Sequence, residues 1–232
     1  MAKKGGSAHL KRISVPRFMF IRRKEAVWLA KPSPGAHRLR DSVPLLVVVR
    51  DLLKLADDSR EARKVIKTGE VLVDAKRTRN ERAPVGLMDV LSVPKMKKYF
   101  RVLLDNKERV KLAEIKEEQA KFKIGKILAK RTAPGGKIQI SLHDGRSVLA
   151  TDLHKVGDSV KLAVPEQKIE AAYKLEPGAR CLITRGKHAG ELAVVDEIFP
   201  GSEAREAEAK LHTDAGSFIT VKKYLFVVGD NL

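Results

Sequence analysis

Four cationic side chains recur at helical spacing within one short segment of the sequence. They stand at positions i, i+3, i+4 and i+7 and are Arg60, Arg63, Lys64 and Lys67. A helix would place them on one face, with Ala62, Val65 and Ile66 on the opposite side. Like charges this close repel one another unless an anion faces them. The spacing therefore predicts a phosphate-binding surface. An ordinary solvated helix face is the alternative, but this face contains no acid.

A second group of cations follows in a predicted loop, residues 74–82, between a strand predicted at 71–73 and a second strand predicted from residues 84–86 and 89–93. These cations are Lys76, Arg77, Arg79 and Arg82. We expect the loop and the preceding helix to contact the same polyanion, because they are adjacent in the chain.

The first forty residues carry the largest excess of positive charge. They hold eleven Lys and Arg and one acid, a net of +10 within a formal total of +18. Such a segment cannot form a core, so we predict a basic extended N-terminal arm that becomes ordered along phosphates. A merely soluble tail is the alternative. Phe18, Phe20 and Trp28 favour the arm, because aromatic rings stack on bases or dock on protein. Further cations expected to contact RNA are Arg17, Arg22, Arg23 and Lys24.

No catalytic or metal-binding pattern accompanies these cations. The six histidines are scattered, without HExxH or paired spacing, and Cys181 is the single cysteine. The serines lie outside any nucleophile elbow, and residues 186–190 lack the ending of a phosphate-binding P-loop. The sequence predicts that the protein is not an enzyme and has no metal, cofactor or small-molecule substrate.

Composition sets the class of partner and compartment. The 232 residues are 43% hydrophobic, enough for one to three small domains, and the pI near 10.0 indicates a polyanionic partner. The longest apolar run, Pro44–Val49, is too short to span a bilayer, so we expect no membrane partner. A lone cysteine fits the reducing cytoplasm. Residues 12–31 have the Arg-rich composition of a transit peptide, but Pro and aromatic residues disfavour that interpretation.

The periodicity predicts an α+β, multidomain chain. After the arm (1–40), we expect a small helix–helix–strand RNA-binding module at 41–104. Its first helix would be capped by Ser42 with Pro44 in the first turn, and its second would run from about 60 to 67, capped by Ser59 and ended by Gly69.

Short strands separated by Gly and Asp follow, typical of small barrels or sandwiches. We predict a central β-rich domain at 105–173 and a last β-barrel domain at 174–232. Expected strands are 100–104, 109–112, 126–130, 137–142, 159–164, 179–184 and 191–198, with a short helix within 114–122. Residues 175–232 have a net charge of −2, unlike the rest of the chain.

Two segments resemble known RNA-binding motifs. Residues 59–66 and 69–74 resemble the RNA-binding module of bacterial ribosomal protein S-four, which implies RNA contacts for the cations of the helix and loop; Ala75 stands where that module often has glycine. The module also occurs in pseudouridine synthases, tRNA synthetases and ribosome-rescue proteins. Residues 179–198 resemble the KOW motif of ribosomal proteins and elongation factors. That resemblance implies an exposed basic turn whose Arg185, Lys187 and His188 contact RNA, with Gly190 in a conformation that other residues resist.

The order of these parts resembles the small-subunit ribosomal protein S4e family, of archaeal type, over nearly the whole chain. Further matching segments are 9–12, 32–40, 84–90, 155–160 and 226–229. The first two imply RNA contacts for His9, Lys11, Arg12, His37, Arg38 and Arg40. The resemblance implies a cytoplasmic, structural constituent of the small ribosomal subunit that binds the 5′ domain of its rRNA and neighbouring ribosomal proteins.

Two alternatives remain open from the sequence. One is a dissociable RNA-binding factor for ribosome assembly or transcription elongation, which should wash off ribosomes in high salt. The other is a pseudouridine synthase, which would need a catalytic domain with an Asp nucleophile. Residues 105–232 are too divided into short β segments to favour such a domain.

Overall fold

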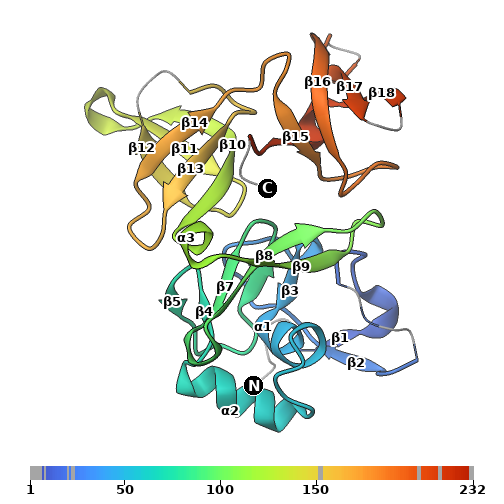
Figure 1. Cartoon of the computed structure of the whole chain (residues 1–232), viewed down its shortest axis with the longest axis vertical. Coiled ribbons are helices and arrows are strands. Elements are labelled where there is room, and N and C mark those ends of the chain that lie inside the picture. The colour runs from blue at the N-terminus through green and yellow to red at the C-terminus, as the bar shows by residue number, and fades with distance from the viewer. Residues whose placement is uncertain are drawn as a thin grey trace, which may run out of the picture.

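The computed structural model describes residues 7, 9–19, 21, 24–150, 154–202, 205–213 and 216–229. Figure 1 shows three bodies: α1, α2 and β1–β9 form the lower one, β10–β14 an upper one, and β15–β18 another beside it. The described strands pair antiparallel throughout. The architecture is β-rich, with few helices and several small sheets.

The first body has two short strand pairs, a five-stranded sheet and two helical segments. The pairs are β1 (His9–Lys11) with β2 (Trp28–Ala30), and β3 (Ser42–Pro44) with β6 (Pro84–Gly86). The sheet order is β5 (Lys76–Arg77), β4 (Leu72–Val73), β7 (Val90–Val93), β8 (Lys98–Leu104) and β9 (Val110–Ile115). The helical segments are α1 (Leu45–Val47), which continues into a π-helical turn (Val48–Leu52), and α2 (Ser59–Thr68).

Both helix starts differ from the prediction. Ser42 is not a helix cap, because it lies in β3 and pairs with Gly86 of β6. The helix begins at Leu45, with Pro44 at the N-cap. A strand partner from β6 prevails over the capping tendency of Ser42. In α2 the cap is Asp58, whose carboxylate accepts from the backbone N–H of Ser59 at 2.7 Å. The predicted end of this helix is confirmed, because the C-cap residue Gly69 is left-handed at φ 76°.

The described part of the N-terminal segment is part of the first body, in contrast to the predicted extended arm. Phe18, Met19, Ile21 and Leu29 are buried in the same apolar cluster as the helices. The carbonyl of Phe18 also accepts from the N–H of Val110 at 3.0 Å. The composition of the segment did not predict this packing. A few apolar residues are enough to bury a segment when the rest of the core comes from another part of the chain. Phe20, Arg22 and Arg23 lie outside the described residues.

The central body is a five-stranded sheet in the order β12 (Ser147–Ala150), β11 (Ile138–Leu142), β10 (Phe122–Thr132), β13 (Ser159–Ala163) and β14 (Ile169–Tyr173). The predicted strands 126–130, 137–142 and 159–164 and the hairpin β8–β9 are confirmed. The short helix predicted within 114–122 is α3 (Glu117–Ala120). β12 and β14 were not predicted; they lie at the two edges of the sheet, where alternate exposure weakens the apolar pattern.

The C-terminal body has the order β18 (Gly216–Val221), β17 (Glu208–Thr213), β16 (Leu192–Phe199), β15 (Arg180–Ile183) and β19 (Leu225–Val227). The strands predicted on either side of residues 185–190 correspond to β15 and β16. The remaining three were not predicted. Short 3-10 turns also occur at Arg12–Ser14, Leu39–Asp41, Pro94–Met96, Pro134–Gly136 and Lys222–Tyr224.

Three apolar clusters form the core, and one of them joins the bodies. Each upper body has its own cluster. The largest cluster fills the first body and also includes Ile124 of β10 together with Leu182 and Phe226 of the C-terminal body. Burial of shared apolar surface therefore holds the three bodies together.

Candidate RNA interface

The predicted cationic stripe lies on the outer face of α2. Ala62 and Ile66 are fully buried, which turns the opposite face to solvent. All four stripe cations are exposed and line a shallow groove of about 440 Å³ with Thr68: Arg60, Arg63, Lys64 and Lys67. One acid does reach this face from the following loop, because Glu81 pairs with Arg63 Nε at 2.6 Å. The groove is open and positive, a geometry suited to a phosphate backbone.

The loop cations lie on a hairpin that follows the same helix. β4 and β5 are joined by a two-residue turn in which Asp74 and Ala75 both have positive φ, 49° and 56°. Ala75 thus adopts the left-handed conformation that glycine favours. Lys76, Arg77 and Arg79 are exposed. Arg82 is half-buried, and its Nε donates to the carbonyl of Lys31 at 2.8 Å.

A buried ion cluster fixes the base of this hairpin. Asp74 accepts from Lys123 Nζ of β10 at 3.0 Å, and Lys123 also contacts Asp89 and Asp144. Arg146 pairs with Asp74 and lies 3.3 Å from Asp144. Lys123 is completely buried. Because its partners come from two bodies, the cluster ties the hairpin to the central sheet.

The cluster is charged rather than neutral. Burial alone would raise the pKa of Asp89, but Lys123 and then His37 hold that pKa well below its usual range. Burial likewise opposes the charged form of Lys123, yet Asp89 and the other two carboxylates keep its pKa above the ordinary lysine value. No local pattern in the sequence indicates this arrangement, since the aspartates and the lysine are far apart in the chain.

The N-terminal candidates divide into exposed and buried residues. Exposed are His9, Lys11, Arg17, Lys24, Arg38 and Arg40. Arg12 is half-buried and donates to the carbonyl of Ile21. Trp28 is 51% exposed; Lys11 Nζ lies 5.6 Å from its ring, and the His9 ring meets it edge-on at 4.6 Å.

His37 has a structural position instead of an exposed one. Its side chain is 3% exposed, and its Nε2 lies 2.9 Å from Asp89 Oδ2. The same carboxylate oxygen accepts from the N–H of Gly86 at 2.8 Å. A Cβ on Gly86 would lie 2.4 Å from the His37 ring, so glycine is required for this close approach. The predicted RNA contact of His37 is therefore wrong, because its buried ring is not accessible from solvent.

The basic turn between β15 and β16 docks on the first body. Arg185 pairs with Asp41 at 2.7 Å, and the N–H of Gly186 donates to Glu108 at 2.8 Å. Gly190 has φ +82°, and a Cβ there would meet the carbonyl carbon of Asp105 at 2.7 Å. His188 is half-buried, stacked on Phe218 and bonded to Glu191 at 3.0 Å, whereas Lys187 stays exposed. The turn thus makes contacts within the molecule that the resemblance to a KOW motif did not predict.

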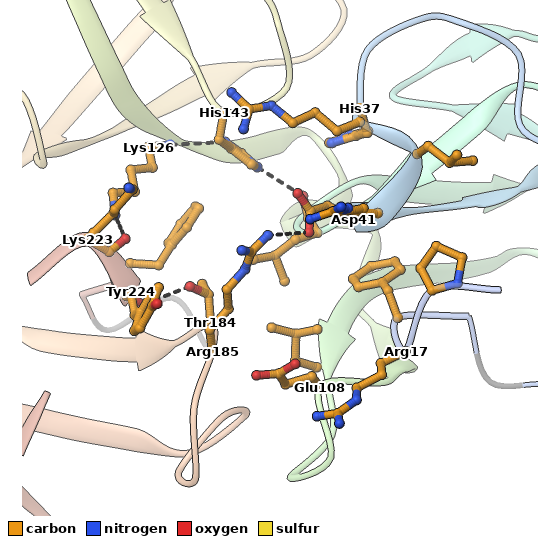
Figure 2. A pocket seen from close by; sticks show the side chains of 18 of the residues that line it. Arg17, His37, Asp41, Glu108, Lys126, His143, Thr184, Arg185, Lys223 and Tyr224 are labelled. Carbon is orange, nitrogen blue, oxygen red and sulfur yellow. Dashed lines mark hydrogen bonds and ion pairs between the residues drawn. The ribbon is translucent and has the colours of Figure 1, made fainter. Parts of the chain in front are cut away.

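A cleft of about 550 Å³ opens where the three bodies meet (Figure 2). Its cations are Arg17, Arg38, Arg40, Lys126, Arg185 and Lys223. Lys126, Lys223 and Tyr224 were absent from the sequence-based candidates, because their meeting depends on the docking of the last two bodies. Lys126 is buried, and its Nζ donates to the carbonyls of Lys223 and Leu225 at 2.7 and 2.6 Å.

Two residues that line the cleft, Lys126 and His143, have strongly lowered pKa values. Burial lowers the pKa of the Lys126 ammonium to about 8. Burial, followed by the charge of Lys123, lowers the pKa of His143 to about 4. His143 is neutral at pH 7, with Nε2 donating to the carbonyl of Leu87 at 3.1 Å and Nδ1 accepting from the N–H of Lys126 at 3.2 Å. The ring therefore links the first and central bodies.

The described part of the chain offers little for a metal site, a reactive cysteine or a membrane-spanning helix. No group of three or more His, Cys, Asp or Glu side chains among the described residues could hold a metal ion. Cys181 is buried, and burial raises its thiol pKa to about 12. No described helix is long and apolar enough to cross a membrane.

Comparison with known proteins gives the class of the chain. The model of ribosomal family S4e matches residues 96–169, and that of the RS4NT (NUC023) domain matches residues 4–40. Together with the β-rich fold and the cationic surfaces, these matches define a ribosomal protein. Such a protein is structural and not enzymatic, so the pseudouridine synthase hypothesis is dropped.

Full-length relatives give the family. The chain is 46% identical over 231 residues to "small ribosomal subunit protein eS4" of Methanosphaera stadtmanae, covering 100% of this chain and 96% of the relative. The protein of that name from Methanothermobacter thermautotrophicus is 45% identical over 99% of this chain and 95% of its own. The crystal structure of 30S ribosomal protein S4e from Thermoplasma acidophilum matches with a TM-score of 0.71 and 34% identity, covering 82% and 95% of the two chains. The chain belongs to the S4e family of ribosomal proteins.

Proposed function

We propose that this protein is a structural constituent of the small ribosomal subunit that binds small-subunit rRNA through phosphate and shape contacts. The names of its relatives and the excess of positive charge support this role. We further propose the 5′ domain of the rRNA as the binding region, neighbouring ribosomal proteins as partners and the cytoplasm as the compartment. Cofactors, small-molecule substrates and membranes have no part in the proposal.

The exposed cationic groove on α2 is the observation that carries the RNA contact. Its four cations and Lys76, Arg77 and Arg79 of the adjacent hairpin belong to one short stretch of chain, residues 60–79, and all seven are exposed. Arg63 shares its charge with Glu81, so the other cations supply most of the uncompensated charge. Because A-form RNA presents its phosphates and not its base edges to such a face, shape should count more than sequence.

The test replaces the four stripe cations by Ala together. With a 5′-domain rRNA fragment, we expect weaker binding and a shallower salt dependence, whose slope falls by about one for each phosphate that the variant no longer neutralises. A matched control removes the same charge from exposed lysines of the central body, Lys121, Lys137, Lys155 and Lys168. Both variants should keep the wild-type unfolding midpoint. Equal reductions of affinity in the two variants would mean that only net charge matters.

A dissociable RNA-binding factor is the alternative. Sedimentation of the tagged protein at moderate and high salt separates the two roles, because a surface contact of six to ten phosphates loses roughly 10³–10⁵ in affinity between about 50 and 200 mM salt. We expect the protein to remain with the small subunit. Release, or migration with polymerase, would favour the factor.

A further inference from the structure

The cleft between the three bodies has the size and lining of a ligand site. Its volume of about 550 Å³ lies within the roughly 300–1,000 Å³ range of clefts that hold small molecules. Apolar side chains line part of it, among them Leu87, Leu104 and Leu128, with Tyr224 beside them. Leu128 and Leu39 are 46% and 39% exposed, so apolar surface stays open to solvent here. A flat, apolar group fits against such a lining.

The charge of the cleft is only partly compensated within the protein. Its two acids are already engaged, Asp41 with Arg185 and Glu108 with the N–H of Gly186. Among the described residues, no carboxylate lies within ion-pair distance of Arg17, Arg38 or Arg40. They are all exposed, so their charge is available to an anion entering from solvent.

The interior of the cleft adds to this positive field. The buried Lys126 ammonium is bonded to carbonyl oxygens and not to a carboxylate (Figure 2). Lys223 lies 3.6 Å from Glu206, a loose and exposed pair. A low-dielectric wall strengthens the attraction of the remaining cations for an anion.

We propose that this cleft holds one unpaired nucleotide of an RNA strand, with the base against the apolar lining and a phosphate among Arg17, Arg38 and Arg40. This inference rests on the proposed RNA binding and adds a second site to the groove on α2. A duplex cannot enter a cleft of this volume, whereas an unstacked base can be splayed out and held by apolar and cationic groups. The site therefore selects single-stranded over double-stranded RNA.

The test compares two fluorescent RNAs by anisotropy, an octauridylate and a duplex of the same length. The variant Leu39→Glu places a carboxylate in the cleft, and Ile219→Glu places one on β18, where Ile219 is 61% exposed. We expect Leu39→Glu to weaken octauridylate binding about 10-fold, equivalent to the loss of one stacked base, and to leave duplex binding within about 2-fold. Ile219→Glu should leave both within about 2-fold. An equal loss for both RNAs in Leu39→Glu, or no loss, would overturn the proposal.

A second variant and a crosslink keep the test independent of folding. Arg38→Ala with Arg40→Ala should show the same preference as Leu39→Glu. Photo-crosslinking of octauridylate carrying 5-iodouridine should label the peptide that contains Tyr224. Labelling confined to the α2 peptide would contradict the cleft. Uridine 5′-monophosphate that competes as well as octauridylate would identify a free nucleotide as the ligand and overturn the RNA assignment.

The two proposals fail in different ways. If the wild-type protein bound neither the octauridylate nor the duplex, the proposed function itself would be wrong. Duplex binding that is lost in the α2 variant, together with unaltered octauridylate binding in Leu39→Glu, would remove only the cleft site.

Discussion

Lys123 and Asp74 form a fully buried ion pair of 3.0 Å between two bodies of the molecule. Asp74 is the first residue of the turn that carries the basic hairpin, and its carboxylate also accepts from the N–H of Val90 at 3.0 Å. The basic hairpin is therefore anchored to the central sheet through a charge hidden from solvent. This ion pair therefore holds the exposed cations of the hairpin at a fixed position relative to the central sheet.

Replacing Lys123 by Met should destabilise the protein by about 3–5 kcal/mol, because three buried carboxylates lose their shared cation. Urea unfolding at pH 7 measures this loss. Lys121→Met is the control, since Lys121 is exposed and only two residues away. The loss should shrink as the pH falls toward about 4, where the carboxylates left without Lys123 become protonated. A loss below about 1 kcal/mol would mean that the cluster contributes little.

His143 should make stability fall in mild acid. Its pKa is about 4 in the folded protein and 6.5 in the unfolded chain, because burial and Lys123 disfavour the imidazolium. The unfolded chain thus binds the proton first, so the stabilisation is complete above pH 6.5 and is lost as the pH falls toward 4, by about 3 kcal/mol in total.

The variant His143→Gln tests this assignment by removing the titration while keeping a neutral polar side chain. We expect its unfolding free energy to depend less on pH between 6.5 and 4 than that of the wild type. Both proteins keep Asp89 and Asp144, whose pKa values lie below the usual range because of Lys123, so the difference isolates His143. His212→Gln, at an exposed position of β17, should follow the wild-type profile. Parallel profiles for wild type and His143→Gln would contradict the assignment.

Substitutions at Gly190 and Gly186 distinguish the cost of backbone strain from the cost of a steric clash in the docked turn. Both have positive φ, but a Cβ meets Asp105 at 2.7 Å only at Gly190, whereas nothing lies within 4 Å at Gly186. Gly186→Ala should cost about 1 kcal/mol through its backbone alone. Gly190→Ala should cost more, because the turn must also move away from the first body. Thermal unfolding of both variants checks the order, and equal costs would mean that the backbone at Asp105 yields without penalty.

Phe18 tests whether the N-terminal segment is part of the free protein's core. Phe18 is 7% exposed, so Phe18→Ala should lower the unfolding free energy by about 3 kcal/mol in the absence of RNA. Ile13→Ala, at a side chain that is 95% exposed, should change it by less than about 0.5 kcal/mol. If the segment became ordered only on RNA, both variants would match the wild type.

The sequence by itself determined the features that depend on local periodicity and composition. The helix with its cationic face, the hairpin β8–β9 and the concentration of positive charge in the first forty residues all follow from residues close together in the chain. The order of motifs was also sufficient to indicate the S4e family, which full-length relatives bear out. Periodicity succeeds here because a helix face or a strand pair is defined by spacing alone.

Only the tertiary structure decided which charged residues face solvent. His37 was predicted to contact RNA, yet it is buried beside Asp89, as is Lys123. The cleft likewise depends on Arg17, Asp41 and Arg185 meeting across three segments of the chain. A buried charge is tolerated only where distant partners compensate its desolvation. Such partners leave no mark on local spacing, and they come together only when the chain folds and its bodies dock.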